Sequence, residues 1–323
     1  MAAEIALSKQ AAGEGRPGTI GDPLFRGITL FFAFLVLAIL GGVLLSLLVG
    51  ALPALRAFGI GFLVADVWNP VTEKFGAVTP IYGTLVTSAI AMLIGIPVAF
   101  GVAVFITEIC PIWLKRPLST MIELLAAIPS IIYGIWGLFV FAPFVQAQIE
   151  PAIIATLGQL PGIGALFAGP PLGIGVLTAG FILAIMVLPF ISAVMRDVFE
   201  TVPTILKESA YGLGATRAEV MWRVVLPYTR IGVVGGIMLG LGRALGETMA
   251  VTFVIGNAHH IRLSVLQPGT TISATLANEF TEAVGDLYLS SLIALGFILF
   301  VITFIVLAIA KLLLLRLQQQ AGG

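Results

Sequence analysis

Six long apolar stretches constrain this chain more than any other feature of its sequence. A helix needs about 20 predominantly apolar residues to cross the hydrocarbon core of a membrane. Only 10% of the residues are charged, against about 25% in soluble domains, and 59% are hydrophobic. The sequence therefore predicts an all-α membrane protein with six transmembrane helices. The expected spans are residues 27–52, 78–107, 118–144, 172–195, 229–256 and 289–315.

The spans form one predicted transmembrane domain over residues 27–316. Tails of more polar composition flank it at residues 1–26 and 317–323. The formal net charge is zero, which gives no basis for a nucleic-acid partner. The apolar spans make membrane lipid the expected surroundings of this domain. A single cysteine, Cys110, excludes an intrachain disulfide and any CxxC motif.

The distribution of Lys and Arg predicts the orientation of the helices. Six spans place both termini on one side, and cytoplasmic loops carry the excess of positive residues. Twelve of the 16 Lys and Arg residues lie on the side of the termini. We therefore expect both termini to be cytoplasmic. The twelve residues are Lys9, Arg16, Arg26, Lys115, Arg116, Arg196, Lys207, Arg217, Arg223, Arg230, Lys311 and Arg316.

The longest cytoplasmic segment, residues 202–227, has a helical pattern that an irregular connector would lack. Its first apolar run is broken near Gly214, and Thr216 then begins a second helical run. Glu219 follows Thr216 by three residues, which predicts a capping box. Leu226–Pro227 is expected to end this second helix. Two short helices around a glycine turn predict a protrusion that fits a groove in a partner protein.

The same segment resembles the EAA motif of bacterial ABC importer permeases. The spacing of the family pattern is intact, with Ser in place of its second residue and Val224 in place of Ile. The resemblance assigns contact with an ATPase to this motif. The matching residues are Glu208, Ser209, Ala210, Gly214, Leu226 and Pro227.

Three further stretches are similar to phosphate-specific permeases of this family, and the likeness covers roughly residues 25–317. The stretches are "WNPVTEKFGAVTPIYGTLVTS", "ELLAAIPSIIYGIWGLFVFAP" and "LGRALGETMAVTFVIGN". The resemblance implies a type I ABC importer permease core with cytoplasmic coupling helices, in a bacterial inner membrane. It also implies a second permease chain, two ATPase subunits and a periplasmic phosphate-binding protein.

No enzymatic chemistry is expected in this chain. The sequence contains no G-x-x-x-x-G-K-[ST] loop that could hold ATP phosphates. It also shows no nucleophile–base constellation and no cluster of metal ligands. We therefore expect no cofactor and no metal here, with ATP and Mg²⁺ bound by the partner ATPases.

Two charges, Arg243 and Glu247, lie near the middle of the fifth expected span. A charge at the centre of a membrane costs about 2.5–3.5 kcal/mol on insertion scales, so both side chains should face protein or water. Residues four apart share one face of a helix, so the two can form an ion pair. A guanidinium presents a fork of donors that matches phosphate, and Thr248 could add a hydroxyl. The family resemblance likewise implies a role in phosphate passage for Arg243 and Glu247, and the alternative is a structural clamp between helices.

Several alternatives remain open at this stage. An importer of the same architecture could carry sulfate or molybdate, because arginine recognises any tetrahedral oxyanion. A secondary transporter or channel would work without an ATPase, and the EAA-like spacing argues against it. Glu108 and Glu123 are interpreted as charges near the membrane interface, and His259–His260 as ordinary loop histidines without the spacing of a helical metal site.

Overall fold

The computed structural model describes residues 21–319, which are mostly helical. Residues 1–20 and 320–323 of the two expected tails lie outside this range. Six helical runs among the described residues have the length and apolar composition of membrane-spanning helices, which confirms the all-α membrane fold. The runs are Asp22–Phe58, Val78–Ile109, Ser130–Gln159, Val176–Glu200, Arg217–Leu245 and Asp286–Arg316.

The described residues form α-helices that are joined in several places by 3₁₀-helical or π-helical turns. In chain order the α-helices are α2 (Gly21–Phe58), α3 (Gly61–Val64), α4 (Val78–Val104), α5 (Ile112–Ala127), α6 (Ser130–Trp136), α7 (Ala142–Phe144), α8 (Glu150–Thr156), α9 (Val176–Glu200), α10 (Thr204–Gly212), α11 (Arg217–Val220), α12 (Leu226–Leu245), α13 (Met249–Thr252), α14 (Ile272–Glu279) and α15 (Asp286–Gln319). The π-helical turns are η1 (Phe105–Ile109), η2 (Gly137–Phe141), η3 (Val145–Ile149) and η6 (Met221–Val225), and the 3₁₀ turns are η4 (Leu157–Gln159) and η5 (Gly164–Phe167). Two short antiparallel strands are β1 (Trp68–Asn69) and β2 (Lys74–Phe75).

Internal contacts divide the chain inside α2, between Val49 and Gly50. In the first unit, the part of α2 that precedes Gly50 exposes apolar side chains such as Phe25 and Phe34 around its circumference. A helix that is apolar all round is suited to a lipid environment. The second unit, from Gly50 onward, holds all the remaining elements and is described by itself below.

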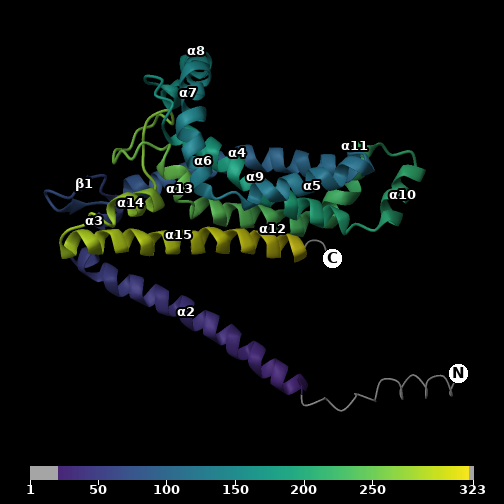
Figure 1. The fold of residues 1–323 in the computed structure, drawn as a ribbon, viewed down its shortest axis with the longest axis horizontal. Helices are drawn as coiled ribbons and strands as arrows, with labels where there is room; N and C mark the ends of the chain where they lie inside the picture. The colour runs from purple at the N-terminus through teal and green to yellow at the C-terminus, as the bar shows by residue number, and fades with distance from the viewer. Residues whose placement is uncertain (1–20, 320–323) are drawn as a thin grey trace. The chain divides into compact units, whose positions relative to one another are not determined.

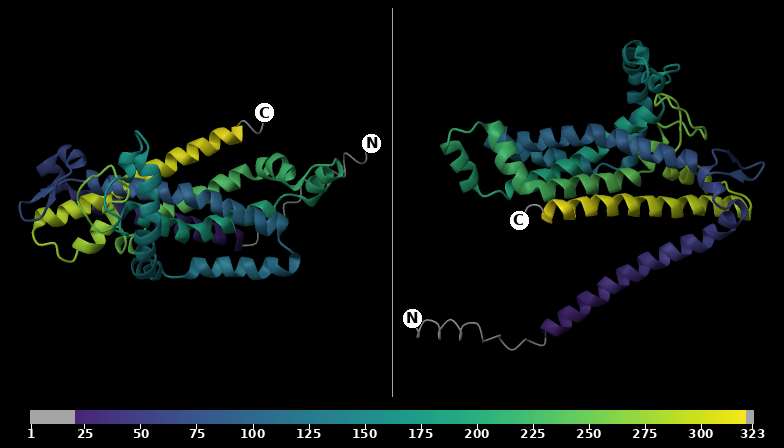
Figure 2. Two further views of the ribbon diagram at one scale, coloured as in Figure 1. Left: turned by 90° about the horizontal axis from the view of Figure 1, so that it is seen from above. Right: turned by 180° about the vertical axis from the view of Figure 1, so that it is seen from behind.

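Helix α9 is the centre of the second unit and packs against both α4 and α12, as Figures 1 and 2 show. Its side chains Ile182, Leu183, Val187 and Ile191 are fully buried. A Cβ atom on Gly240 of α12 would lie only 2.5 Å from Ile191. Glycine at this position therefore allows the backbones of α9 and α12 to approach closely, as small residues do between membrane helices.

The third expected span, residues 118–144, is not one continuous helix. Helix α5 ends at Ala127, Ile128 is extended with ψ 127°, and α6 begins after Pro129. Proline has no N–H to donate and disfavours the α conformation at the residue before it, which accounts for a break at this position. Beyond the break, helical structure continues as far as Gln159, and this run lies across the direction of α4, α9 and α12 (Figure 1).

The fifth expected span, residues 229–256, is also interrupted. Helix α12 ends at Leu245 and α13 begins at Met249, with Gly246 out of the helical conformation between them (φ −95°, ψ 1°). Glycine has the lowest helix propensity apart from proline, so a helix stops readily at this residue. At the other end, helical structure begins at Arg217, twelve residues before the expected start at 229.

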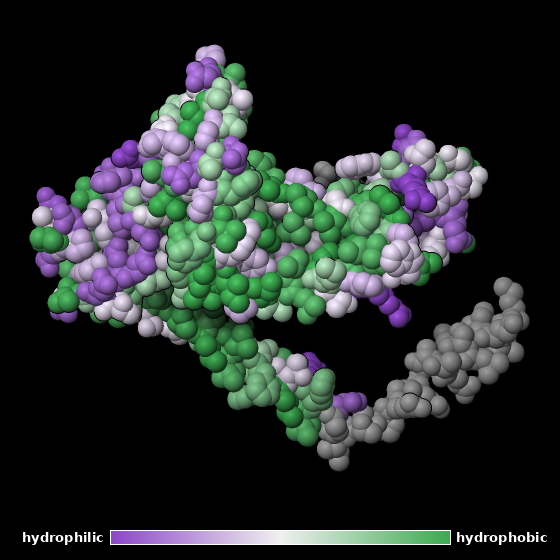
Figure 3. All heavy atoms as spheres, turned by 45° about the horizontal axis from the view of Figure 1, so that its top comes forward, coloured by the Kyte–Doolittle hydropathy of each residue, from purple (hydrophilic) through white to green (hydrophobic). Residues whose placement is uncertain are grey.

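The polar elements of the second unit gather at the two ends of the helix bundle. One end carries α10 and α11, and the other carries β1, β2 and α14 (Figure 1). Figure 3 shows hydrophilic side chains at both of these ends, separated by an apolar band over the helices. This pattern is the one expected when the band lies in hydrocarbon and the ends lie in water.

A partly buried carboxylate organises the end that carries β1 and α14. Glu279 accepts hydrogen bonds from Trp68 Nε1 at 2.6 Å and from Tyr288 OH at 2.7 Å, and lies 2.7 Å from His259 Nε2. The His259 ring stacks on Trp68 with 5.5 Å between ring centroids. Burial raises the pKa of Glu279, but these hydrogen bonds outweigh it, so the net pKa is lowered.

We expect Glu279→Gln to lower the free energy of unfolding by about 1–3 kcal/mol at neutral pH, because its amide NH₂ faces one of the donors. Since the folded pKa of Glu279 is lowered, its contribution is complete above the unfolded value of about 4.3 and disappears as pH falls through the folded value. Thermal unfolding in detergent checks this, with exposed Glu282→Gln as the matched control. A stability difference that is absent, or that persists unchanged to pH 3, would contradict it.

Candidate substrate pathway and docking surface

Arg243 lies in the last turn of α12 and points toward α9. Its guanidinium carbon is 4.1 Å from the centroid of the Phe190 ring, a cation–π geometry that stabilises a partly desolvated charge by about 0.5–2 kcal/mol. The side chain is half-buried, and its Nε is buried with no hydrogen-bond partner. The guanidinium donates no hydrogen bond to any described residue. The guanidinium is therefore held on one face by an aromatic ring, and its donors have no acceptor among the described residues.

The ion pair that the spacing of Arg243 and Glu247 predicts is not formed. No ion pair joins these two described residues, because Gly246 ends the helix between them. Glu247 Oε1 instead accepts a hydrogen bond of 3.3 Å from the N–H of Ala250 and so caps the first turn of α13. The prediction that one helical face carries both charges is wrong, although both lie at the break between α12 and α13.

Thr248 lies at the same break, directly before α13. Its hydroxyl is 3.4 Å from the carbonyl oxygen of Gly246, a long contact that leaves the hydroxyl weakly engaged. Its carbonyl accepts a shorter hydrogen bond, of 2.7 Å, from the hydroxyl of Thr252. The break therefore places a guanidinium, a carboxylate and a hydroxyl within six residues of chain.

The segment at the opposite end has the two predicted short helices, α10 and α11. Thr216 Oγ1 accepts from the N–H of Glu219 at 3.3 Å, and Glu219 Oε2 accepts from the N–H of Thr216 at 2.9 Å, which confirms the capping box. Gly214 connects the helices with φ +86°, a left-handed conformation that favours glycine. The glycine turn expected from the sequence is therefore present.

Leu226–Pro227 does not end the second helix, contrary to the prediction. The chain runs from α11 through the π-helical turn η6 into α12 without leaving helical conformation. Pro227 lies in the first turn of α12, where its missing N–H costs least. The wider turn η6 comes directly before it, a kind of local adjustment that accommodates proline in membrane helices.

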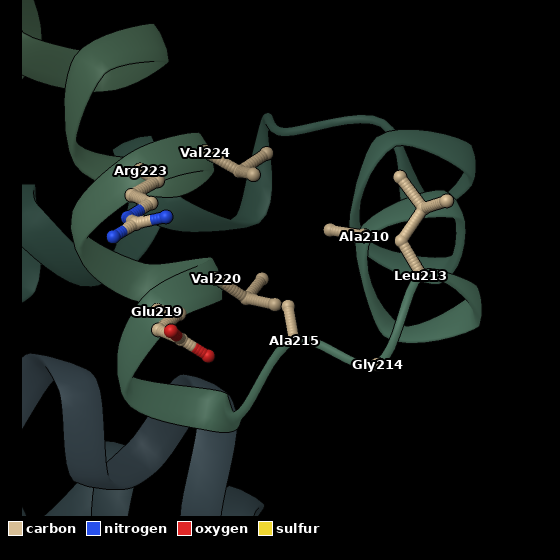
Figure 4. A pocket seen from close by; sticks show the side chains of 8 residues that line it. All are labelled: Ala210, Leu213, Gly214, Ala215, Glu219, Val220, Arg223 and Val224. Carbon is tan, nitrogen blue, oxygen red and sulfur yellow. The ribbon is translucent and has the colours of Figure 1, made fainter.

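A hollow separates α10 from α11 and η6, as Figure 4 shows. Leu213 stands at its rim with 91% of its surface exposed, while Glu219 and Arg223 lie on the facing helix. Among the motif residues, Ala210 and Gly214 line the hollow, and Glu208 and Ser209 are exposed on α10. An exposed leucine beside charged side chains forms a surface that is suited to a groove of a partner protein. The lining residues are Ala210, Leu213, Gly214, Ala215, Glu219, Val220, Arg223 and Val224.

Sequence reasoning missed the partners of the charges near α10. Glu108 pairs with Lys207, 99 residues later in the chain, and Glu123 pairs with Arg196 at 2.9 Å. The sequence indicates only that both glutamates lie near the membrane interface. No short-range pattern signals such pairs, because helices far apart in sequence bring the partners together.

The six apolar helical runs define a multi-pass membrane protein. Residues 95–319 match the family model described as "Binding-protein-dependent transport system inner membrane component". The chain belongs to this family of importer permeases.

Several named relatives are similar over nearly their whole length. The chain is 63% identical to the phosphate transport system permease protein PstC of Mesorhizobium japonicum, covering 94% of this chain and 92% of the relative. Identity to PstC of Pasteurella multocida is 58%, covering 93% of each chain. PstC of Haemophilus influenzae is 54% identical, with 93% of this chain and 95% of the relative covered.

Two solved structures share the fold at low sequence identity. A bacterial ABC transporter involved in the import of the acidic polysaccharide alginate aligns with a TM-score of 0.58 and 17% identity, covering 91% of this chain and 99% of that chain. The MetNI methionine ABC transporter, in an inward-facing conformation, aligns with a TM-score of 0.51 and 18% identity. The alignment covers 77% of this chain and 96% of that chain. These likenesses identify the type I importer permease fold.

Proposed function

We propose that this chain is a transmembrane permease subunit of an ATP-driven importer of inorganic phosphate in a bacterial inner membrane. The names of relatives that share 54–63% of their residues with it support phosphate as the substrate. Membership of a binding-protein-dependent family supports delivery of phosphate by a periplasmic binding protein. It also favours an ATP-driven importer over a secondary transporter or a channel.

The observation that carries this proposal is the unpaired guanidinium of Arg243. A cation inside a membrane span is expensive unless it serves a function, and this one has no protein acceptor for its donors among the described residues. Arginine binds two phosphate oxygens through parallel N–H···O contacts, and it stays charged at any accessible pH. Phosphate passing α12 would thus meet a preformed donor fork, with Glu247 and Thr248 beside it at the helix break.

The hollow beside Leu213 supports docking of an ATPase at the end that carries α10. In this account the α10 end is cytoplasmic, both termini lie on that side, and a second permease chain completes the pathway. Two ATPase subunits bind ATP and Mg²⁺, so this chain performs no hydrolysis itself. Phosphate can shift the permease between outward-open and inward-open states only through its different affinity for the two.

Uptake of labelled phosphate by cells whose only phosphate permease is this chain tests the proposal, with the partner subunits coexpressed. We expect uptake that continues after the proton gradient is dissipated, stops when ATP is depleted, and is unaffected by excess sulfate or molybdate. Equal competition by either anion would identify an importer for another oxyanion. Uptake that survives ATP depletion would identify a secondary transporter or a channel.

A further inference from the structure

A close ion pair joins α10 to the end of the α4 run. Lys207 Nζ lies 2.5 Å from Glu108 Oε1, with Lys207 on α10 and Glu108 in η1, which directly continues α4. Only 18% of the lysine side chain and 10% of the glutamate side chain are exposed. The contact therefore connects the helix that borders the docking hollow with a helix of the membrane-spanning bundle.

The Lys207–Glu108 pair is more deeply buried than a second Lys–Glu pair at the same end of the bundle. Lys115 and Glu200 lie 2.9 Å apart, but their side chains are 36% and 45% exposed, so water screens their attraction. A shielded pair resists separation more strongly, because each charge left alone would lack both a partner and full hydration. Of the two pairs, Lys207–Glu108 is the one suited to hold two elements together while they move.

The helical run formed by α4 and η1 connects Glu108 with the helices that carry the candidate site. A Cβ on Gly95 of α4 would lie 3.4 Å from Val187 of α9, and one on Gly240 of α12 would lie 3.8 Å from Met92 of α4. Gly240 precedes Arg243 by one helical turn, and Phe190, whose ring faces Arg243, is also on α9. Close packing of this kind transmits displacement, because protein interiors are as dense as organic crystals.

We propose that Lys207 and Glu108 are positioning residues that transmit movement of α10 to α4, and through α4 to the helices around Arg243. This inference rests on the proposed function, in which α10 belongs to the ATPase docking segment. Without the pair, α10 would still carry the docking surface, but its displacement would reach α4 only through weaker contacts. The pair would then set how efficiently hydrolysis is converted into transport, and would leave assembly unaffected.

The test uses the complete transporter in proteoliposomes, with its ATPases, second permease and binding protein. The variants are Lys207→Glu, Glu108→Lys and the double charge swap, with Lys115→Glu as the matched exposed control. The measurements are phosphate transported per ATP hydrolysed and the amount of ATPase that copurifies. We expect each single reversal to lower the transport ratio by about tenfold with normal copurification, the swap to restore most of it, and the control to leave it unchanged.

The neutral double variant Lys207→Met with Glu108→Gln serves if a single reversal fails to assemble, because it leaves no charge buried alone. It should assemble and show the same loss of coupling. Wild-type transport ratios in the single reversals or in the neutral variant would overturn the inference, as would a charge swap that assembles but restores nothing. A wild-type complex that transports no phosphate would instead refute the proposed function, so the two failures are distinguishable.

Discussion

Arg243→Gln abolishes phosphate uptake in the complete transporter while leaving insertion and assembly intact. Glutamine removes the charge and the two-donor fork, and charge-assisted hydrogen bonds contribute about 1.5–3 kcal/mol each. Two such bonds correspond to a loss of about 100-fold or more in uptake at limiting phosphate. The measurement is initial uptake rate against phosphate concentration, normalised to the amount of chain in the membrane.

Two further variants make this prediction specific to the side chain and its position. Arg230→Gln makes the same change on the same helix, near the beginning of α12, and should transport normally. Arg243→Lys keeps the charge without the fork and should fall between wild type and Arg243→Gln. Normal uptake by Arg243→Gln would reduce Arg243 to a structural clamp against Phe190 and leave the family assignment untouched.

Gly214→Val uncouples the ATPases from the permease. Gly214 has φ +86° and nothing within 4 Å of an added Cβ, so backbone strain, with no steric clash, sets the cost of substitution. Holding a residue with a side chain in the left-handed region costs about 1–2 kcal/mol, and β-branching adds to it. The turn between α10 and α11 would shift, and we expect about 30-fold weaker copurification of ATPase and a matching loss of uptake.

Gly212→Val is the matched control for this turn. Gly212 also has open space around an added Cβ, but it lies at the end of α10 without a positive φ. The Gly212→Val variant should copurify with ATPase nearly as well as the wild type. Equal behaviour of the two variants, whether both bind or both fail, would show that the left-handed turn does not shape the docking surface.

The sequence was sufficient for features that depend on local composition and spacing. The six apolar stretches predicted the membrane fold, because enough apolar residues in a row leave few alternatives. The capping box at Thr216 and the turn at Gly214 were also predictable, since each depends on residues within a few positions of one another. Residues close together in the sequence determine each of these features.

The helix breaks were harder to predict, because apolar composition alone does not distinguish a continuous helix from an interrupted one. Pro129 stops α5, whereas Pro97 and Pro189 lie inside α4 and α9 without ending them. Glycine behaves in the same way: Gly246 ends α12 and so prevents the expected Arg243–Glu247 pair, whereas Gly240 and Gly242 lie inside the helix. The pairing of Lys207 with Glu108 depends entirely on the fold, so no spacing rule could have found it.

A structure of the assembled transporter with bound phosphate, captured between its outward-open and inward-open states, tests the central claim most directly. The claim is that the guanidinium of Arg243 is kept free inside the membrane for a passing anion. The account predicts an anion with its oxygens about 2.7–2.9 Å from the terminal nitrogens of Arg243, in a cavity between the two permease chains. A guanidinium enclosed by neighbouring helices, bonded to protein acceptors and remote from any such cavity, would contradict it.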